Sequence, residues 1–219
     1  MPFTAKSGKF NASINTVEFG TGDKAVKIGG ENVFPLYSFD AAIENAPKVG
    51  IEITDFGMEH EPECIKKYYE GCATLADMAR KAASMEGVDF LSFRMEGGDP
   101  NGANKSTEEL IGELKEIADA VDLPLVVCGC KNVEKDAELF SKAAEALNGK
   151  NAVILSAKEE NYKTVGAAAG LAYKQIVGAE SAVDINLAKQ LNVLISQLGV
   201  DSKSVVMNVG SAAVGYGFE

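Results

Sequence analysis

The sequence has few histidines and cysteines, two residue types from which many metal centres and catalytic sites are built. Its 219 residues include one histidine, four cysteines and no tryptophan. A single histidine excludes a multi-histidine metal site and argues against a Ser-His-Asp triad. That histidine, His60, lies in the charged segment EHEPE at 59–63, where we expect a surface position. The sequence also lacks a G-x-S-x-G elbow and a P-loop.

The four cysteines are too few for a disulfide scaffold and too scattered for an iron–sulfur cluster. Cys128 and Cys130 are two residues apart at the end of a predicted strand, so we expect both side chains on one face. Zinc and iron–sulfur sites need further cysteines at tight spacing, whereas Cys64 and Cys72 are eight residues apart. We therefore predict reduced thiols in the core and no metal bound by this chain.

Basic residues are outnumbered, 21 to 32, by acidic residues, which gives a formal net charge of −11. A chain this acidic is not attracted to phosphate backbones or anionic lipids, so we expect no nucleic-acid and no membrane partner. No apolar run approaches the roughly 20 residues of a membrane span, and the first residues, MPFTAK, lack the apolar segment of a signal peptide. We predict a cytoplasmic protein.

From residue 49 onward the chain has the pattern of alternating strands and helices. Near-continuous apolar runs, typical of a parallel sheet covered on both faces, recur at intervals of about 25 to 40 residues. Between them, STEE at 106–109 is a capping box that predicts a helix start. A stripe of leucines before Gly199 predicts a core-facing helix. The predicted strands are 49–53, 89–95, 124–128, 152–155, 179–183 and 204–208.

Two architectures fit this alternation, an open doubly wound sheet and a (β/α)₈ barrel. The segment after the first strand, TDFGMEH at 54–60, contains no G-x-G-x-x-G loop, which weakens a dinucleotide-binding interpretation but leaves a flavodoxin-like sheet open. A barrel would have about six of its eight βα units here and lack the C-terminal ones. We therefore expect either a piece of a longer protein or a gap that a partner covers.

The first 48 residues differ from the rest. Residues 14–19 and 25–28 alternate apolar and polar side chains on either side of a turn rich in glycine and aspartate. This pattern predicts an N-terminal β-hairpin. The expected division is a hairpin cap at 1–48 and a partial TIM-barrel domain at 49–219.

Polar residues follow each predicted strand, at the edge where parallel α/β folds form their sites. The most unusual segment is EGGDPNGAN at 96–104, whose glycines would permit close approach of the backbone to a ligand. Amides and glycines predominate over carboxylates across the six strand ends, and no nucleophile–base pair stands out. Such a surface suits holding a large molecule with polar edges better than hydrolysis.

Five segments, taken in order, resemble the small subunit of the corrinoid/iron–sulfur protein of the reductive acetyl-CoA pathway. Its archaeal counterpart is the delta subunit of the acetyl-CoA decarbonylase/synthase complex. The segments are MEGGDPNGANKS at 95–106, PLVVCGCKNVEKDAE at 124–138, SAKEENYKTVGAAA at 156–169, SAVDINLAKQLNVLISQLG at 181–199 and VVMNVGSAAVGYGFE at 205–219. The resemblance covers the chain from about residue 25 to its end.

The resemblance implies a TIM barrel that pairs with a larger subunit carrying a [4Fe–4S] cluster and a corrinoid (cobalamin). The top of this barrel would cover the corrinoid. The cobalt would receive a methyl group from methyltetrahydrofolate through a separate methyltransferase and deliver it to acetyl-CoA synthase/CO dehydrogenase. This chain would catalyse no step and would not ligate cobalt, because it lacks the D-x-H-x-x-G motif of other corrinoid proteins. It also departs from the family in ending two βα units early.

Ten barrel-top positions in the matching segments are the candidate corrinoid contacts. They are Glu96, Asp99, Asn104, Asn161, Tyr162, Asp184, Asn186, Gln190, Asn208 and Tyr216.

Two other hypotheses stay open. A pterin-binding barrel, such as a methyltetrahydrofolate methyltransferase or dihydropteroate synthase, holds its ligand with Asp and Asn at strand ends, and Asp184, Asn186 and Asn208 could imitate that arrangement. A structural barrel that only docks other subunits is the third hypothesis. Tight binding of methyltetrahydrofolate without a partner would favour the enzyme.

Overall fold

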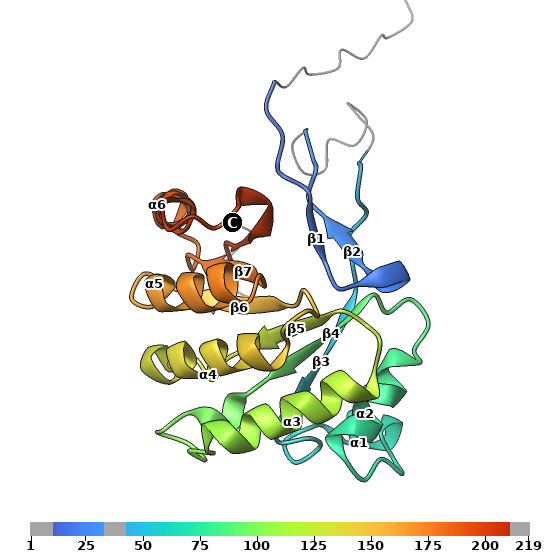
Figure 1. Ribbon diagram of the computed structural model, residues 1–219. Helices are drawn as coiled ribbons and strands as arrows, with labels where there is room; N and C mark the ends of the chain where they lie inside the picture. Colours follow the sequence, from blue (N-terminus) through green and yellow to red (C-terminus); the bar gives the residue numbers. More distant parts are fainter. Residues whose placement is uncertain (1–10, 33–42, 211–219) are drawn as a thin grey trace, which may run out of the picture.

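The computed structural model describes residues 11–32 and 43–210, in which strands and helices alternate (Figure 1). The strands are β1 (Val17–Phe19), β2 (Val26–Ile28), β3 (Gly50–Thr54), β4 (Phe90–Arg94), β5 (Leu125–Cys128), β6 (Val153–Ala157), β7 (Ile176–Glu180) and β8 (Val205–Asn208). The helices are α1 (Glu63–Tyr68), α2 (Leu75–Ala83), α3 (Thr107–Ala120), α4 (Val133–Ala146), α5 (Tyr162–Val165) and α6 (Ile185–Gln197). None of the described helices is both long and apolar enough to span a bilayer.

Six strands form one parallel sheet in the order β3-β4-β5-β6-β7-β8. Each strand therefore lies beside its neighbour in the chain. A doubly wound sheet reverses its strand order at a switch point, and no reversal occurs among these six strands. The α/β class is confirmed, and the doubly wound alternative is wrong for the described strands.

One predicted strand is misplaced. Five of the six predicted ranges agree with the observed strands to within two residues, but the prediction 179–183 is wrong because β7 spans Ile176–Glu180. Ala182 and Val183 have φ angles of 45° and 70°, a left-handed conformation that cannot continue a strand. The true start was missed because glycine 178 interrupts its apolar run.

Helix α3 begins where the capping motif predicts. The hydroxyl oxygen of Ser106 accepts a hydrogen bond from the backbone N–H of Glu109 at 3.1 Å. The reciprocal pair of bonds that completes a capping box is instead present at α2, between Thr74 and Asp77. Both devices satisfy backbone donors that the first helical turn leaves free, so they fix where each helix starts.

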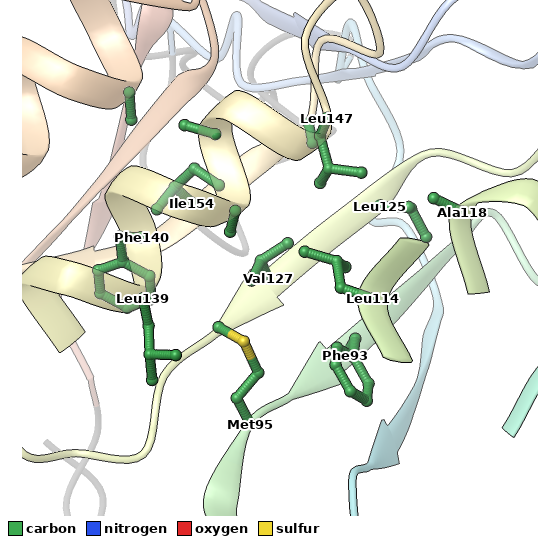
Figure 2. Packing of buried hydrophobic residues seen from close by; sticks show 14 of the residues in the cluster. Phe93, Met95, Leu114, Ala118, Leu125, Val127, Leu139, Phe140, Leu147 and Ile154 are labelled. Carbon is green, nitrogen blue, oxygen red and sulfur yellow. The ribbon is translucent and has the colours of Figure 1, made fainter. Parts of the chain in front are cut away.

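Helices α2 to α6 and one face of the sheet share a single apolar cluster, which we call the helix-side cluster. Phe93 of β4 and Val127 of β5 share this cluster with Leu114 of α3 and Leu139 of α4 (Figure 2). These four side chains are 0–1% exposed. Side chains alternate along a strand. The strand residues next to those of the helix-side cluster therefore point to the opposite face of the sheet, which we call the inner face.

The hairpin of β1 and β2 packs against the inner face. The two strands pair antiparallel, with Phe19 opposite Val26, as the alternation predicts. Both residues are buried and belong to a second apolar cluster that contains Val153 of β6 and Ile176 of β7. Val153 and Ile176 are the first residues of their strands, so the hairpin covers the amino ends of the inner face.

Two further contacts fix the hairpin there. The ring of Phe19 lies edge-on to that of Phe90, the first residue of β4, with centroids 5.7 Å apart. The amide nitrogen of Asn151, just before β6, donates to the carbonyls of Glu18 at 3.0 Å and Gly20 at 3.3 Å. The hairpin therefore does not cover the carboxyl half of the inner face.

Replacing Phe19 by alanine should destabilise the protein strongly. The side chain is 2% exposed, and truncating a buried phenylalanine costs about 3–5 kcal/mol. Urea unfolding followed by circular dichroism measures the change. Lys27→Ala, on the exposed side of the same hairpin, should change stability by no more than about 0.5 kcal/mol. Equal effects of the two substitutions would contradict the docked hairpin.

Candidate functional site

The carboxyl half of the inner face is polar. Arg94, Glu180 and Asn208 end their strands and alternate with residues of the helix-side cluster, so their side chains belong to the inner face. They line a cavity of about 260 Å³ that lies at the carboxyl ends of the strands. The complete lining is Arg94, Cys128, Gly129, Lys131, Asp136, Leu155, Ser156, Lys158, Glu180 and Asn208.

Ion pairs and hydrogen bonds link the strands around this cavity. Arg94 forms a two-pronged pair with Glu52 of β3, with Nε–Oε1 at 2.8 Å and Nη2–Oε2 at 2.9 Å. Hydrogen bonding to the Glu52 carboxylate raises the pKa of Arg94. Lys158 Nζ lies 3.7 Å from Glu180 Oε1, a looser contact. The cavity wall therefore consists of charged groups that are partly neutralised by one another.

A neutral pair completes the wall. The side-chain amide of Asn208 donates to the hydroxyl oxygen of Ser156 at 3.3 Å. The hydroxyl hydrogen of Ser156 is thus left available for a further acceptor. Across the cavity, hydrogen-bond donors are more numerous than nucleophiles or bases.

The loop that follows β4 is held by a buried carboxylate. Asp55, directly after β3, accepts the backbone N–H of Gly97 at 2.9 Å, and Lys105 Nζ lies 3.0 Å from its other oxygen. A Cβ at residue 97 would overlap this carboxylate. The glycine is therefore required by close approach to the chain's own Asp55, whereas the sequence suggested approach to a ligand.

A second buried carboxylate holds the loop that follows β5. Asp136 of α4 is 4% exposed and accepts the backbone N–H of Cys130 at 2.7 Å. A Cβ at Gly129 would overlap Asp136. The two loops are thus held in the same way. In each, a buried carboxylate accepts a hydrogen bond from a backbone N–H of the loop, and a glycine of the loop packs directly against that carboxylate.

The two neighbouring cysteines do not face the same way, contrary to the prediction. Cys128 is the last residue of β5 and belongs to the inner-face cluster, whereas Cys130 belongs to the helix-side cluster. The strand ends between them, so the period of two no longer applies. Burial raises the pKa of the Cys128 thiol, and burial raises the pKa of Cys130 to about 11. Both are therefore protonated thiols at neutral pH, and neither is an activated nucleophile.

Three predicted site residues lie at the cavity or at the space next to it. Asn208 lines it directly, and Glu96 and Asp99 line an adjoining space of about 170 Å³. The two spaces share Arg94, Gly129 and Lys131 in their walls. Together they form one polar rim at the carboxyl ends of β4, β5, β6, β7 and β8.

Asn104, Asn161 and Tyr162 are not gathered at this rim. Asn161 is 5% exposed, accepts from the backbone of Lys158 at 2.8 Å and donates to the carbonyl of Val133 at 3.3 Å, so it fastens a loop. Tyr162 packs against the helix-side cluster. Asn104 is exposed and has a left-handed φ of 51°.

The residues predicted on the segment after β7 belong to helix α6. Asp184 is its N-cap and accepts from the backbone N–H groups of Asn186 at 2.8 Å and Leu187 at 3.0 Å. Asn186 and Gln190 are exposed on the helix, and none of the three lines the cavity. Tyr216 lies outside the described residues. Capping of the helix therefore accounts for Asp184, while a ligand contact of Asn186 and Gln190 stays a prediction.

Several rim residues were absent from the predicted set, among them Arg94, Lys131, Lys158 and Glu180. The prediction considered polar residues just past each strand, whereas Arg94 and Glu180 are the last residues of their strands. Alternation along the strand was the signal that could have found these two. Among residues 11–32 and 43–210, no group of three or more His, Cys, Asp and Glu is arranged to hold a metal ion, and His60 is exposed against Phe56, as expected of a surface residue.

The arrangement defines a class before it defines a family. A parallel sheet in chain order, covered by helices on one face and carrying a polar cavity at its carboxyl ends, is the plan of α/β proteins that bind ligands at that edge. Within this class, residues 16–219 match the family model described as CO dehydrogenase/acetyl-CoA synthase delta subunit. The chain belongs to that family.

Curated relatives agree with the family match. The chain is 31% identical over 213 residues to the acetyl-CoA decarbonylase/synthase complex subunit delta of Methanothermobacter thermautotrophicus, covering 96% of this chain and 54% of the relative. It is 31% identical over 219 residues to the corresponding subunit of Methanocaldococcus jannaschii, covering 96% and 53%. For that of Archaeoglobus fulgidus the identity is 30% over 205 residues, covering 91% and 44%. The chain spans about half the length of these relatives.

Replacing Gly97 by alanine should destabilise the protein by about 1–3 kcal/mol, because the new methyl group forces Asp55 away from the loop. Gly102→Ala, in the same loop, is the matched control: its methyl group meets only ordinary contacts at 3.6 Å or more, and the expected change is about 0.5 kcal/mol. Urea unfolding measures both. A Gly97→Ala protein as stable as Gly102→Ala would show that Asp55 does not constrain the loop.

The buried Asp136 should make stability fall as the pH rises. Burial raises its pKa, although the N–H of Cys130 opposes the shift, so the folded state holds the proton more tightly than the unfolded chain. The free energy of unfolding should therefore decrease from about pH 4, the ordinary aspartate value, through the raised pKa. Asp136→Asn removes this titration and should gain stability relative to the wild type between pH 4 and pH 7.

Urea unfolding at several pH values tests this expectation. Asp119→Asn, at an exposed position of α3, serves as the control and should leave the slope of stability against pH unchanged. If Asp136→Asn follows the wild-type slope as well, the buried carboxyl is not the group that titrates.

Proposed function

We propose that this chain is the small subunit of a corrinoid/iron–sulfur methyl carrier in the acetyl-CoA pathway, and that its polar rim covers a corrinoid held by a larger subunit. The observation that carries the proposal is the polar cavity at the carboxyl edge of the sheet, in a chain of the delta-subunit family. In this proposal the six strands in chain order are six consecutive strands of a TIM-type barrel. The hairpin lies at the amino end of these strands and the rim at their carboxyl end.

The rim has the chemistry of a cover. Bound in the larger subunit, the corrinoid supplies the cobalt that carries the methyl group. The groups around the cavity donate hydrogen bonds, as Arg94, Lys158 and Asn208 do, and the edge of a corrin ring carries amides that accept them. A cavity of about 260 Å³ takes one such arm and not the ring itself. The residues therefore fit the periphery of the cofactor.

We expect no side chain of residues 11–32 and 43–210 to ligate the metal. His60 is exposed, and the thiols of Cys128 and Cys130 are buried and protonated. We assign to this chain the tasks of orienting the cofactor and excluding water. No bond is formed or broken by its own side chains.

The partners follow from the same proposal. They are the larger subunit with its corrinoid and [4Fe–4S] cluster, a methyltransferase that uses methyltetrahydrofolate, and acetyl-CoA synthase/CO dehydrogenase. The pterin-binding alternative loses its main support, because Asp184 is engaged as an N-cap and does not lie at the cavity with Asn208.

Purification with and without the larger subunit tests the partner requirement. We expect the chain alone to show no corrinoid absorption in the visible spectrum and the complex to show one corrinoid per pair. A stoichiometric corrinoid spectrum from the chain by itself would contradict the proposal. Tight calorimetric binding of methyltetrahydrofolate to the chain alone would favour the pterin-binding alternative.

Two asparagine substitutions test the role of the rim. Asn208→Leu removes a hydrogen-bonding group from the cavity and should slow methyl transfer by about tenfold in the reconstituted complex, the usual cost of a lost buried hydrogen bond. Asn186→Leu, on the exposed surface of α6, is the control and should retain the wild-type rate. Equal rates for both variants would support the purely structural alternative.

A further inference from the structure

The cavity on the inner face brings three cationic side chains together in an acidic protein. The chain has a formal net charge of −11, yet three cationic side chains, Arg94, Lys131 and Lys158, line one space of about 260 Å³. Two carboxylates, Asp136 and Glu180, share that lining. The five charged residues of the lining sum to +1, and the pairing of Arg94 with Glu52 outside the lining brings the local sum to zero, against −11 for the whole chain.

The two carboxylates neutralise these cations incompletely. Asp136 is buried and accepts the N–H of Cys130, so its oxygens serve the loop. Glu180 approaches Lys158 only to 3.7 Å. Within the described ranges Lys131 forms no ion pair, and Arg94 reaches Glu52 through Nε and Nη2, which leaves Nη1 as an unused donor.

Neutral donors lie in the same wall. Ser156 accepts from Asn208, so its own hydroxyl hydrogen is free to donate. Asn208 has a second amide hydrogen beyond the one given to Ser156. A site with three cations and two neutral donors presents more donors than a carboxylate has oxygens, and it matches a phosphate group.

The backbone at Lys131 is strained. Its φ of 71° lies in the left-handed region, which a residue other than glycine or asparagine adopts at a cost of about 1–3 kcal/mol. The loop keeps this conformation because Asp136 holds the neighbouring Cys130. Strained residues cluster at binding sites, and Lys174, Ala182 and Val183 are left-handed in this chain as well.

We infer that this cavity binds a single phosphate group, through Lys131, Lys158, the free nitrogen of Arg94 and the donors of Ser156 and Asn208. The volume admits a phosphate group and excludes a whole nucleotide or cofactor. Binding of a phosphate group by this chain does not depend on the proposed function. The further statement that the phosphate is carried on a side chain of the covered cofactor rests on the proposed function.

Calorimetric titration of the 219-residue chain with inorganic phosphate at low ionic strength tests the inference. We expect saturable binding that weakens as sodium chloride is added, and weaker binding of acetate. Lys131→Gln and Lys158→Gln should each reduce the affinity by about tenfold, the effect of losing one hydrogen bond to a charged group. Circular dichroism and thermal unfolding of both variants verify that they fold.

Lys142→Gln is the matched control. It makes the same change of charge at an exposed position of α4, where the lysine pairs with Glu145 at 3.1 Å, and should bind phosphate as the wild type does. No binding to the wild type, or an equal loss in all three variants, would overturn the inference.

The complex distinguishes the two sources of phosphate. If the cofactor carries the group, adding the corrinoid-bearing larger subunit should abolish binding of inorganic phosphate; if the natural ligand is free phosphate, binding should persist in the complex. Corrinoid association without phosphate binding to the chain would contradict this inference alone. Phosphate binding without corrinoid association would contradict the proposed function alone.

Discussion

The structure depends on the alternation of side chains along parallel strands that are laid down in chain order. One set of alternate residues, such as Phe93 and Val127, forms the cluster beneath the helices. The other set, on the inner face, changes from apolar to polar along the strands. Its first members, such as Val153 and Ile176, are apolar and covered by the hairpin, whereas its last members, such as Arg94, are polar. This change places Arg94, Glu180 and Asn208 at the edge where the loops meet.

Two buried carboxylates set the shape of that edge. Asp55 and Asp136 each receive a backbone N–H from the loop after the adjacent strand, beside a glycine that no other residue can replace without displacing them. Burying an acid is costly unless its oxygens are satisfied, so each carboxylate fixes its loop in one arrangement. The rim is therefore rigid before any ligand or partner arrives, which lowers the ordering cost of binding.

The sequence predicted the fold better than the site, for physical reasons. Buried parallel strands are long apolar runs, and five of the six were placed within two residues because nothing competes with that signal. The sixth was misplaced because it included Ala182 and Val183, whose backbone is left-handed. The apolar pattern of the sequence does not indicate that conformation. Strand order, and with it the choice against a doubly wound sheet, needed the three-dimensional pairing.

The site was harder to predict because short polar residues have two uses. Asp184 and Asn161 follow strands and resemble ligand-binding residues, yet each satisfies nearby backbone groups, a local competition that sequence position alone cannot resolve. Asn208, Glu96 and Asp99 lie at the carboxyl edge, where the sequence placed them, and their contact with a corrinoid stays a prediction. The cationic residues were missed because a lysine or arginine in a soluble protein is usually on the solvent side.

The central claim is that the carboxyl edge of this sheet, and not its hairpin end, faces the corrinoid-bearing subunit. Hydrogen–deuterium exchange of the chain, free and in the reconstituted complex, measures this directly. The account predicts slower exchange of backbone amides at 96–105, 129–132 and 156–161 in the complex, with unchanged exchange in the hairpin turn at 20–25. Protection of the hairpin turn with no change at the three loops would contradict it.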